Sequence, residues 1–146
     1  MADIPEEHLI EELLDRLLAS ASIEQYLDEG LVSARTLTDY LFDRMEAHGL
    51  KRADVVRASG LNATVVYDIF SGKSRPGRDH AIMLAFGLKC TLRETQRLLR
   101  LAGVSELWCK QRRDAIIIWC IRNGFDRIAT DNELYRMGEA TLLPAD

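Results

Sequence analysis

Hydrophobic residues recur along most of this 146-residue chain at the three- and four-residue spacing of amphipathic helices, and the alternation typical of β-strands is rare. The first apolar stripe follows Pro5 and two glutamates, residues that suit the first turn of a helix. The stripe consists of Leu9, Leu13, Leu14, Leu17 and Leu18. The pattern predicts an all-α fold. After the first helix, it predicts helices at 22–29, from Thr36 or Thr38 to Gly49, and at 52–58, 63–70, 80–88, 91–103, 112–122 and 130–137.

Several of these helices have specific end signals. Asn62 is a good N-cap for the helix that follows it, and Thr91 with Glu94 three residues later forms a capping box. Gly60 lies where one helix stops and where a left-handed backbone is needed. Asp79 is the predicted N-cap of the next helix after the loop.

The stretch 115–121 is apolar almost all round, so a buried strand is an alternative to a helix there. Charged residues bound the stretch, and Asn123-Gly124 stops it, which favours the helix. Aromatic residues of this kind are more often core than a platform for stacked bases. We therefore expect four of them in the core: Trp108, Trp119, Phe125 and Tyr135.

Residues 51–70 form the most informative motif, two short helices joined by a tight glycine turn. This is the pattern of a helix-turn-helix unit. Val66 and Ile69 lie three residues apart and so share one face of the second helix, which we expect to be buried. The first helix offers three apolar residues to the same core: Val55, Val56 and Ala58.

The motif runs without a gap into the loop Gly72-Lys73-Ser74-Arg75-Pro76. From Gly49 to Pro76 the sequence resembles the XRE/phage-repressor-like helix-turn-helix family, whose pattern has a Gly-Lys-x-x-Pro loop directly after the recognition helix. The resemblance implies a λ-repressor-like domain of five helices over about residues 36–102. It also implies a function in transcription regulation.

The resemblance extends to a narrower group of bacterial proteins, commonly labelled transcriptional regulators, that begin with an acidic helical lead. The segments that resemble this group are 67–73, 92–99 and 112–117. We therefore expect an acidic N-terminal helical lead (1–34), a helix-turn-helix domain (35–104) and a C-terminal helical extension packed on that domain (105–146).

In this family the recognition helix enters the major groove of DNA with its N-terminal residues. Carried over position by position, the resemblance places Ala63, Thr64, Tyr67 and Asp68 toward the base edges. Strong base readers are Arg, Asn and Gln, so this face indicates limited base reading. The resemblance and the basic character of the segment indicate further contacts to phosphate or base edges by Lys51, Arg52, Asn62, Lys73, Ser74, Arg75 and Arg78.

The net charge of −4 hides a strong asymmetry between two segments. Residues 1–30 have nine acids and one base, whereas residues 51–78 have six bases and two acids. Such asymmetry suggests two different partners. Two functions remain open. One is a sequence-specific regulator that binds double-stranded DNA, with a homodimer possible. The other is a protein-interaction adaptor on the same scaffold, with the acidic N-terminal helices as the partner surface and weak or no DNA binding.

Other classes of function have little support in the sequence. The longest apolar run is too short to cross a membrane, and the acidic start lacks the basic residues of a secretion signal, so we expect a cytoplasmic protein. Cys90, Cys109 and Cys120 form no C-x-x-C pair, and we expect them to serve as small apolar residues rather than metal ligands. No nucleophile or phosphate-binding motif is present, so we expect no enzyme and no cofactor.

Overall fold

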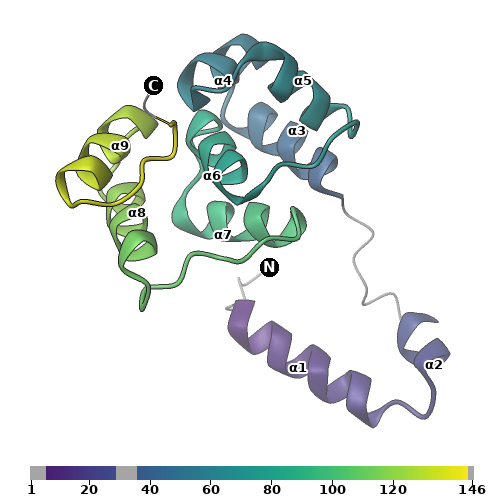
Figure 1. Ribbon diagram of the computed structural model, residues 1–146. Coiled ribbons are helices and arrows are strands. Elements are labelled where there is room, and N and C mark those ends of the chain that lie inside the picture. Colours follow the sequence, from purple (N-terminus) through teal and green to yellow (C-terminus); the bar gives the residue numbers. More distant parts are fainter. Residues whose placement is uncertain (1–5, 29–35, 145–146) are drawn as a thin grey trace. The chain divides into compact units, whose positions relative to one another are not determined.

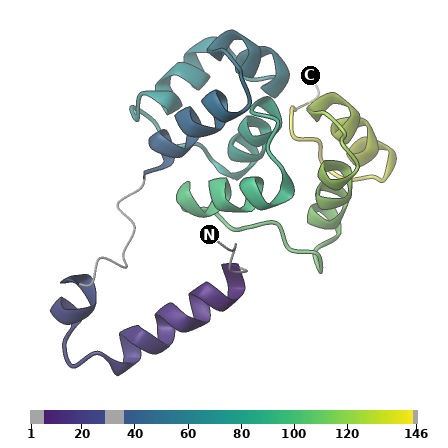
Figure 2. The ribbon, with the colours of Figure 1, turned by 180° about the vertical axis from the view of Figure 1, so that it is seen from behind.

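The computed structural model describes residues 6–28 and 36–144, with side chains from residue 11 onward (Figures 1 and 2). Every regular element among these residues is a helix, which confirms the all-α class. None of the described helices is long and apolar enough to cross a membrane. The chain divides into two units, residues 1–35 and residues 36–146, which we describe separately.

The first unit contains α1 (Glu6–Ala19) and α2 (Ile23–Asp28), which contact each other. The Ser22 side chain accepts a hydrogen bond from the Gln25 amide at 3.2 Å and so caps α2. Leu14 and Leu18 of the predicted leucine stripe are 51% and 75% exposed, so α2 does not cover these two residues. Pro5, with which the first helix was predicted to begin, lies outside the described residues.

The second unit is built around α6, most of which is buried. It contacts α4, α7 and α9, and residues 81–85 are all buried (Figure 1). The helices of this unit are α3 (Leu37–Ala47), α4 (Arg52–Ser59), α5 (Ala63–Phe70), α6 (Arg78–Gly87), α7 (Leu92–Leu101), α8 (Arg112–Arg122) and α9 (Arg127–Arg136).

Two helices begin earlier than the sequence predicts. The predicted cap Asp79 is wrong: α6 begins at Arg78 after Gly77, and the Asp79 carboxylate pairs with Arg113 at 2.9 and 3.1 Å. The last helix begins at Arg127 instead of Thr130, because Asp126 caps it by accepting from the Ala129 amide at 2.8 Å. At α6 the acid close to the helix start had a second available partner, the Arg113 guanidinium.

Glu94 ties α7 to α3. Its carboxylate completes the predicted capping box by accepting from the Thr91 amide at 2.9 Å, and it also pairs with Arg44 and His48. Burial raises the pKa of Glu94, but the Thr91 amide, Arg44 and His48 outweigh burial and hold the pKa below its ordinary value. One carboxylate therefore caps the start of α7 and holds α3 against it.

The helix α8 occupies the whole of the ambiguous apolar stretch, so the predicted helix is confirmed and the strand is excluded. Ile117 and Cys120 point into the core, but the opposite side of this helix stays open. The prediction that the nearby aromatic residues lie in the core is wrong for three of them: Trp108, Trp119 and Tyr135 are 62%, 54% and 78% exposed. A helix that is apolar all round has more apolar surface than its neighbours here can cover.

The cysteines also differ from the prediction at one position. Cys120 is buried and Cys90 is half-buried, as expected of small apolar residues. Cys109 is exposed, because it lies in the connection before α8 and not on the inner face of a helix.

The helices α4 and α6 approach so closely at Gly87 that a side chain would not fit there. A Cβ at this position would lie 2.8 Å from the Ser59 Cβ and 2.8 Å from the Val55 backbone oxygen, both in α4. Such distances are well inside van der Waals contact, and a backbone oxygen has little freedom to move away. The glycine therefore sets the spacing between the first helix of the helix-turn-helix unit and the core.

We expect Gly87→Ser to lower the free energy of unfolding by about 1–3 kcal/mol, because the added atoms force α4 away from α6. Urea denaturation followed by circular dichroism measures this. Gly77→Ser is the matched control, since a Cβ there meets no atom within 4 Å and serine suits the N-cap of α6. Equal losses from both variants would contradict the close approach.

Candidate nucleic-acid interface

The turn between α4 and α5 has the conformation that the sequence predicts. Gly60 is left-handed, with a φ of 81°, and Asn62 caps α5 by accepting from the Val65 amide at 2.9 Å. Before the turn, the buried Ser59 hydroxyl donates to the Val56 carbonyl at 3.1 Å and accepts from the Leu61 amide at 3.2 Å. The Ser59 hydroxyl thus gives hydrogen-bond partners to two backbone groups at the sharp reversal between the helices, the Val56 carbonyl and the Leu61 amide.

The outer face of α5 is open to solvent along the positions expected to face DNA. Val66, Ile69 and Phe70 are buried on its inner side. On the outer side Ala63 and Thr64 are exposed, Tyr67 is 44% exposed and Asp68 is half-buried. The predicted base-facing residues therefore lie on the accessible side of this helix.

Arg52, at the start of α4, is held beside this face by an aromatic contact. Its guanidinium lies 5.3 Å from the centre of the Tyr67 ring, close enough for a cation–π interaction. Lys51 precedes it and is also exposed, and the Lys51 amide donates to Asp54 at 2.9 Å. The structure thus brings Arg52 and Tyr67 together, although the sequence linked them only through the motif.

The loop after α5 folds back onto the end of that helix. The Lys73 and Ser74 amides donate to the Asp68 carbonyl at 2.9 and 3.2 Å, while their side chains and that of Arg75 remain exposed. The Arg75 guanidinium reaches toward Gly103 at the end of α7, 3.9 Å from where a Cβ would stand. The loop backbone is fixed, and its polar side chains are available for contacts outside the chain.

Arg78 differs from the other predicted contacts because its guanidinium has partners within the chain. It pairs with Asp114 at 2.7 and 3.0 Å and donates to the Ser105 and Glu106 carbonyls at 3.0 Å each. Asp114 is 1% exposed. Arg78 therefore joins α6 to α8 and to the connection before α8. The sequence analysis grouped Arg78 with the loop cations, because no local pattern links it to Asp114, which lies far along the chain.

Four of the six cations of the basic segment remain available. Arg57 pairs with Asp54 at 3.1 Å, and Arg78 with Asp114. Among the described residues no ion pair involves the other four cations of the basic segment, Lys51, Arg52, Lys73 and Arg75. The helix α5 itself has one acid, Asp68. The segments that precede and follow α5 along the chain therefore supply the available positive charge.

The turn of this unit is covered by a residue that the sequence analysis did not single out. Arg127, at the start of α9, packs against Gly60, where a Cβ would lie 2.5 Å from the Arg127 Nε. Its side chain is about nine-tenths buried and pairs with Asp131 at 2.7 Å. No local pattern marks this contact, because the two residues lie far apart along the chain.

Comparison with protein-family models, with curated proteins and with solved structures found no match for this chain. Within the described part of the chain, no group of three or more His, Cys, Asp or Glu side chains is arranged to hold a metal ion.

We expect Arg78→Gln to lower the free energy of unfolding by about 3 kcal/mol, because it leaves the buried Asp114 carboxylate without its charge partner. Arg75→Gln should leave stability within about 0.5 kcal/mol, since that side chain is exposed. Urea denaturation of both variants tests this contrast. If Arg78→Gln were as stable as the unchanged chain, the ion pair would not be part of the fold.

Proposed function

We propose that this protein is a transcription regulator that binds double-stranded DNA through α4 and α5. The observation that supports the proposal is an exposed recognition-type helix with an available cation, Arg52, against its Tyr67 and two more, Lys73 and Arg75, in the loop that follows it. Further support comes from the contacts among five successive helices. α3 contacts α5 and α7, and α6 contacts α4 and α7. We propose that α3 to α7 form a λ-repressor-like domain, as the sequence resemblance implies.

In this proposal α5 lies in the major groove, and the residues around it have different roles. Lys51 and Arg52 contact phosphates from one side, and the loop residues Lys73, Ser74 and Arg75 from the other. The exposed amide group of Asn62 donates to a phosphate or base edge, since its oxygen is occupied by the cap. Phosphate contacts of this kind hold the helix in register without reading sequence.

Base reading in this proposal depends on small and weak contacts. Ala63 offers a methyl group to a thymine methyl, Thr64 makes one hydrogen bond, and Tyr67 offers a ring edge. Asp68 either accepts from a cytosine amino group or repels phosphate. A homodimer would compensate, because two such helices on successive half-sites double the number of bases that are read.

We expect binding to random duplex DNA to weaken about 100-fold when the salt concentration rises fourfold, because about four cations per chain contact phosphate. Fluorescence anisotropy with a labelled duplex measures this dependence. Lys73→Ala should reduce the logarithmic salt slope by about one, whereas Arg122→Ala, which removes an exposed charge from α8, should leave it unchanged. A flat response to salt, or no binding at low salt, would contradict the proposal.

We expect Asp68→Asn to tighten duplex binding about fivefold, because it removes the one negative charge from the face of α5. The variant keeps the Asp68 carbonyl that orders the loop. Glu46→Gln, which removes an exposed acid from α3, is the control for net charge and should have little effect. If Asp68→Asn instead abolishes sequence preference, Asp68 reads a cytosine and the assignment of this face is wrong.

A second candidate function is a protein-interaction adaptor on the same scaffold. The exposed aromatic residues of α8 and α9 favour it, because Trp119 and Tyr135 present apolar surface of the kind that protein partners cover. Selection of bound duplexes from a random library separates the two candidates. Recovery of a shared motif supports the regulator, and the absence of any enriched duplex at low salt supports the adaptor.

A further inference from the structure

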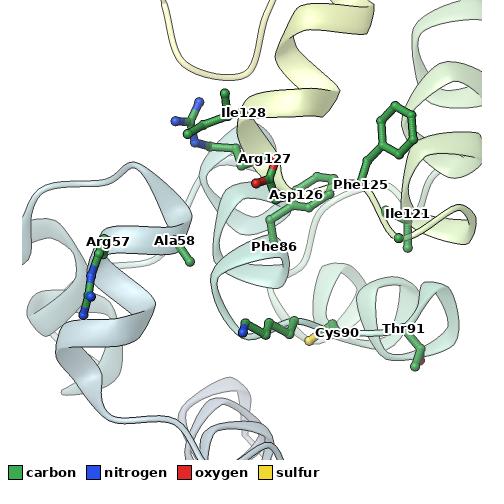
Figure 3. Close-up of a pocket in the computed structure, with 12 residues that line it drawn as sticks. Arg57, Ala58, Phe86, Cys90, Thr91, Ile121, Phe125, Asp126, Arg127 and Ile128 are labelled. Carbon is green, nitrogen blue, oxygen red and sulfur yellow. The ribbon is translucent and has the colours of Figure 1, made fainter.

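A cleft of about 520 Å³ lies between α4, the junction of α6 with α7, and the connection from α8 to α9. Figure 3 shows four of the lining residues: Ala58 on α4, Phe86 on α6, Ile121 on α8 and Phe125 in the connection after α8. Sites for small organic ligands have volumes of about 300–1,000 Å³ and mostly apolar walls with a few polar groups. The size and lining of this cleft fit that class, and the proposed DNA contacts do not use it.

The interior of the cleft is apolar and chemically inert. Phe86, Ile121 and Phe125 are apolar residues of its lining, and Cys90 also lines it. Burial and the neighbouring Glu94 carboxylate raise the pKa of the Cys90 thiol to about 12, so this group is neutral at physiological pH. It acts as part of an apolar wall and not as a nucleophile or metal ligand.

Cations are also among the residues that line the cleft. Lys89 and Arg57 both border it, and among the described residues no ion pair involves Lys89. Lys89 also has a left-handed backbone, with a φ of 56°, a conformation that glycine or asparagine adopts at lower cost. One acid, Asp126, also borders the cleft, which disfavours a multiply charged anion.

One residue that lines the cleft also contacts the turn between α4 and α5. Arg127, one of its lining residues, packs against Gly60, and its Nε has no hydrogen-bond partner among the described residues. Its guanidinium donates to Asp131 at 2.7 Å, and the Asp131 carboxylate also accepts from the Leu142 and Leu143 amides at 2.6 and 3.2 Å. A ligand that shifts the start of α9 therefore acts on the turn through one buried side chain.

We propose that this cleft binds a small organic monoanion with an apolar body, such as a medium-chain or aryl carboxylate. The body lies among Phe86, Ile121 and Phe125, and the carboxylate lies at the opening near Lys89. We further propose that occupancy changes the turn at Gly60 through Arg127. This regulatory part rests on the proposed function, whereas ligand binding itself does not.

Two carboxylates test the binding site directly: octanoate, with a flexible apolar body, and 3-phenylpropanoate, with an aromatic one. Isothermal titration of the full chain should show one site per chain with a Kd below about 1 mM for at least one of them. Octanol, which has a similar apolar body without the charge, should bind at least about tenfold more weakly than octanoate. If neither carboxylate binds in this range, the site does not exist as proposed.

Variants locate the binding within the cleft. Lys89→Asn removes the cation and keeps a residue that tolerates the left-handed backbone, so it should weaken carboxylate binding about tenfold without unfolding the chain. Lys110→Asn is the matched control, an exposed lysine that does not line this cleft, and it should leave binding unchanged. Ala58→Leu should abolish binding by filling the cleft. Binding that neither cleft variant alters would overturn the assignment.

The coupling to the turn is tested first without DNA and then with it. In ¹H–¹⁵N spectra of the labelled chain, the bound carboxylate should shift the amide signals of Gly60 and Leu61. Bound carboxylate should also change duplex affinity about fivefold. A chain that binds carboxylate and shifts Gly60 but binds no duplex would contradict the proposed function alone. The coupling would be overturned if the chain binds carboxylate and duplex, but bound carboxylate changes neither the Gly60 amide signal nor the duplex affinity.

Discussion

The position of the helix-turn-helix unit depends on the close crossing of α4 and α6 at Gly87. Because no side chain separates the two helices there, α4 packs with its backbone against the most buried helix of the unit. α5 follows α4 after a short turn, so its exposed face is set by the same crossing. α4 also borders the cleft through Ala58. One helix thus supports both the proposed DNA face and the proposed ligand site.

Ion pairs join the C-terminal helices to the rest of the second unit. Arg78 with Asp114 and Asp79 with Arg113 form two crossed pairs between α6 and α8. Asp114 is buried, so the loss of Arg78 would leave its charge without compensation. The pair with Asp114 also occupies Arg78. The cations of the basic segment that have no ion pair are therefore those close to α4 and α5 along the chain.

Much of the helical structure follows from local sequence signals, because the interactions that begin and end a helix span only three or four residues. Asn62 and the pair of Thr91 and Glu94 cap their helices as the sequence predicts, and Gly60 is left-handed where the chain reverses. The exposed side of α5 follows from the same apolar spacing. The sequence by itself therefore determined the class of fold, most helix bounds and the accessible face of the candidate interface.

Tertiary structure decided which of several partners each charged side chain took. Asp79 could cap a helix or pair with a cation, and Arg113, far along the chain, determined the outcome. In the same way, the ion pair with Asp114 makes Arg78 unavailable to the predicted interface. Arg127 packs against Gly60, although the two residues lie far apart along the chain. The cleft has walls from three separate parts of the chain. Local pattern cannot supply these results, because they depend on contacts between residues that only the packed helices bring together.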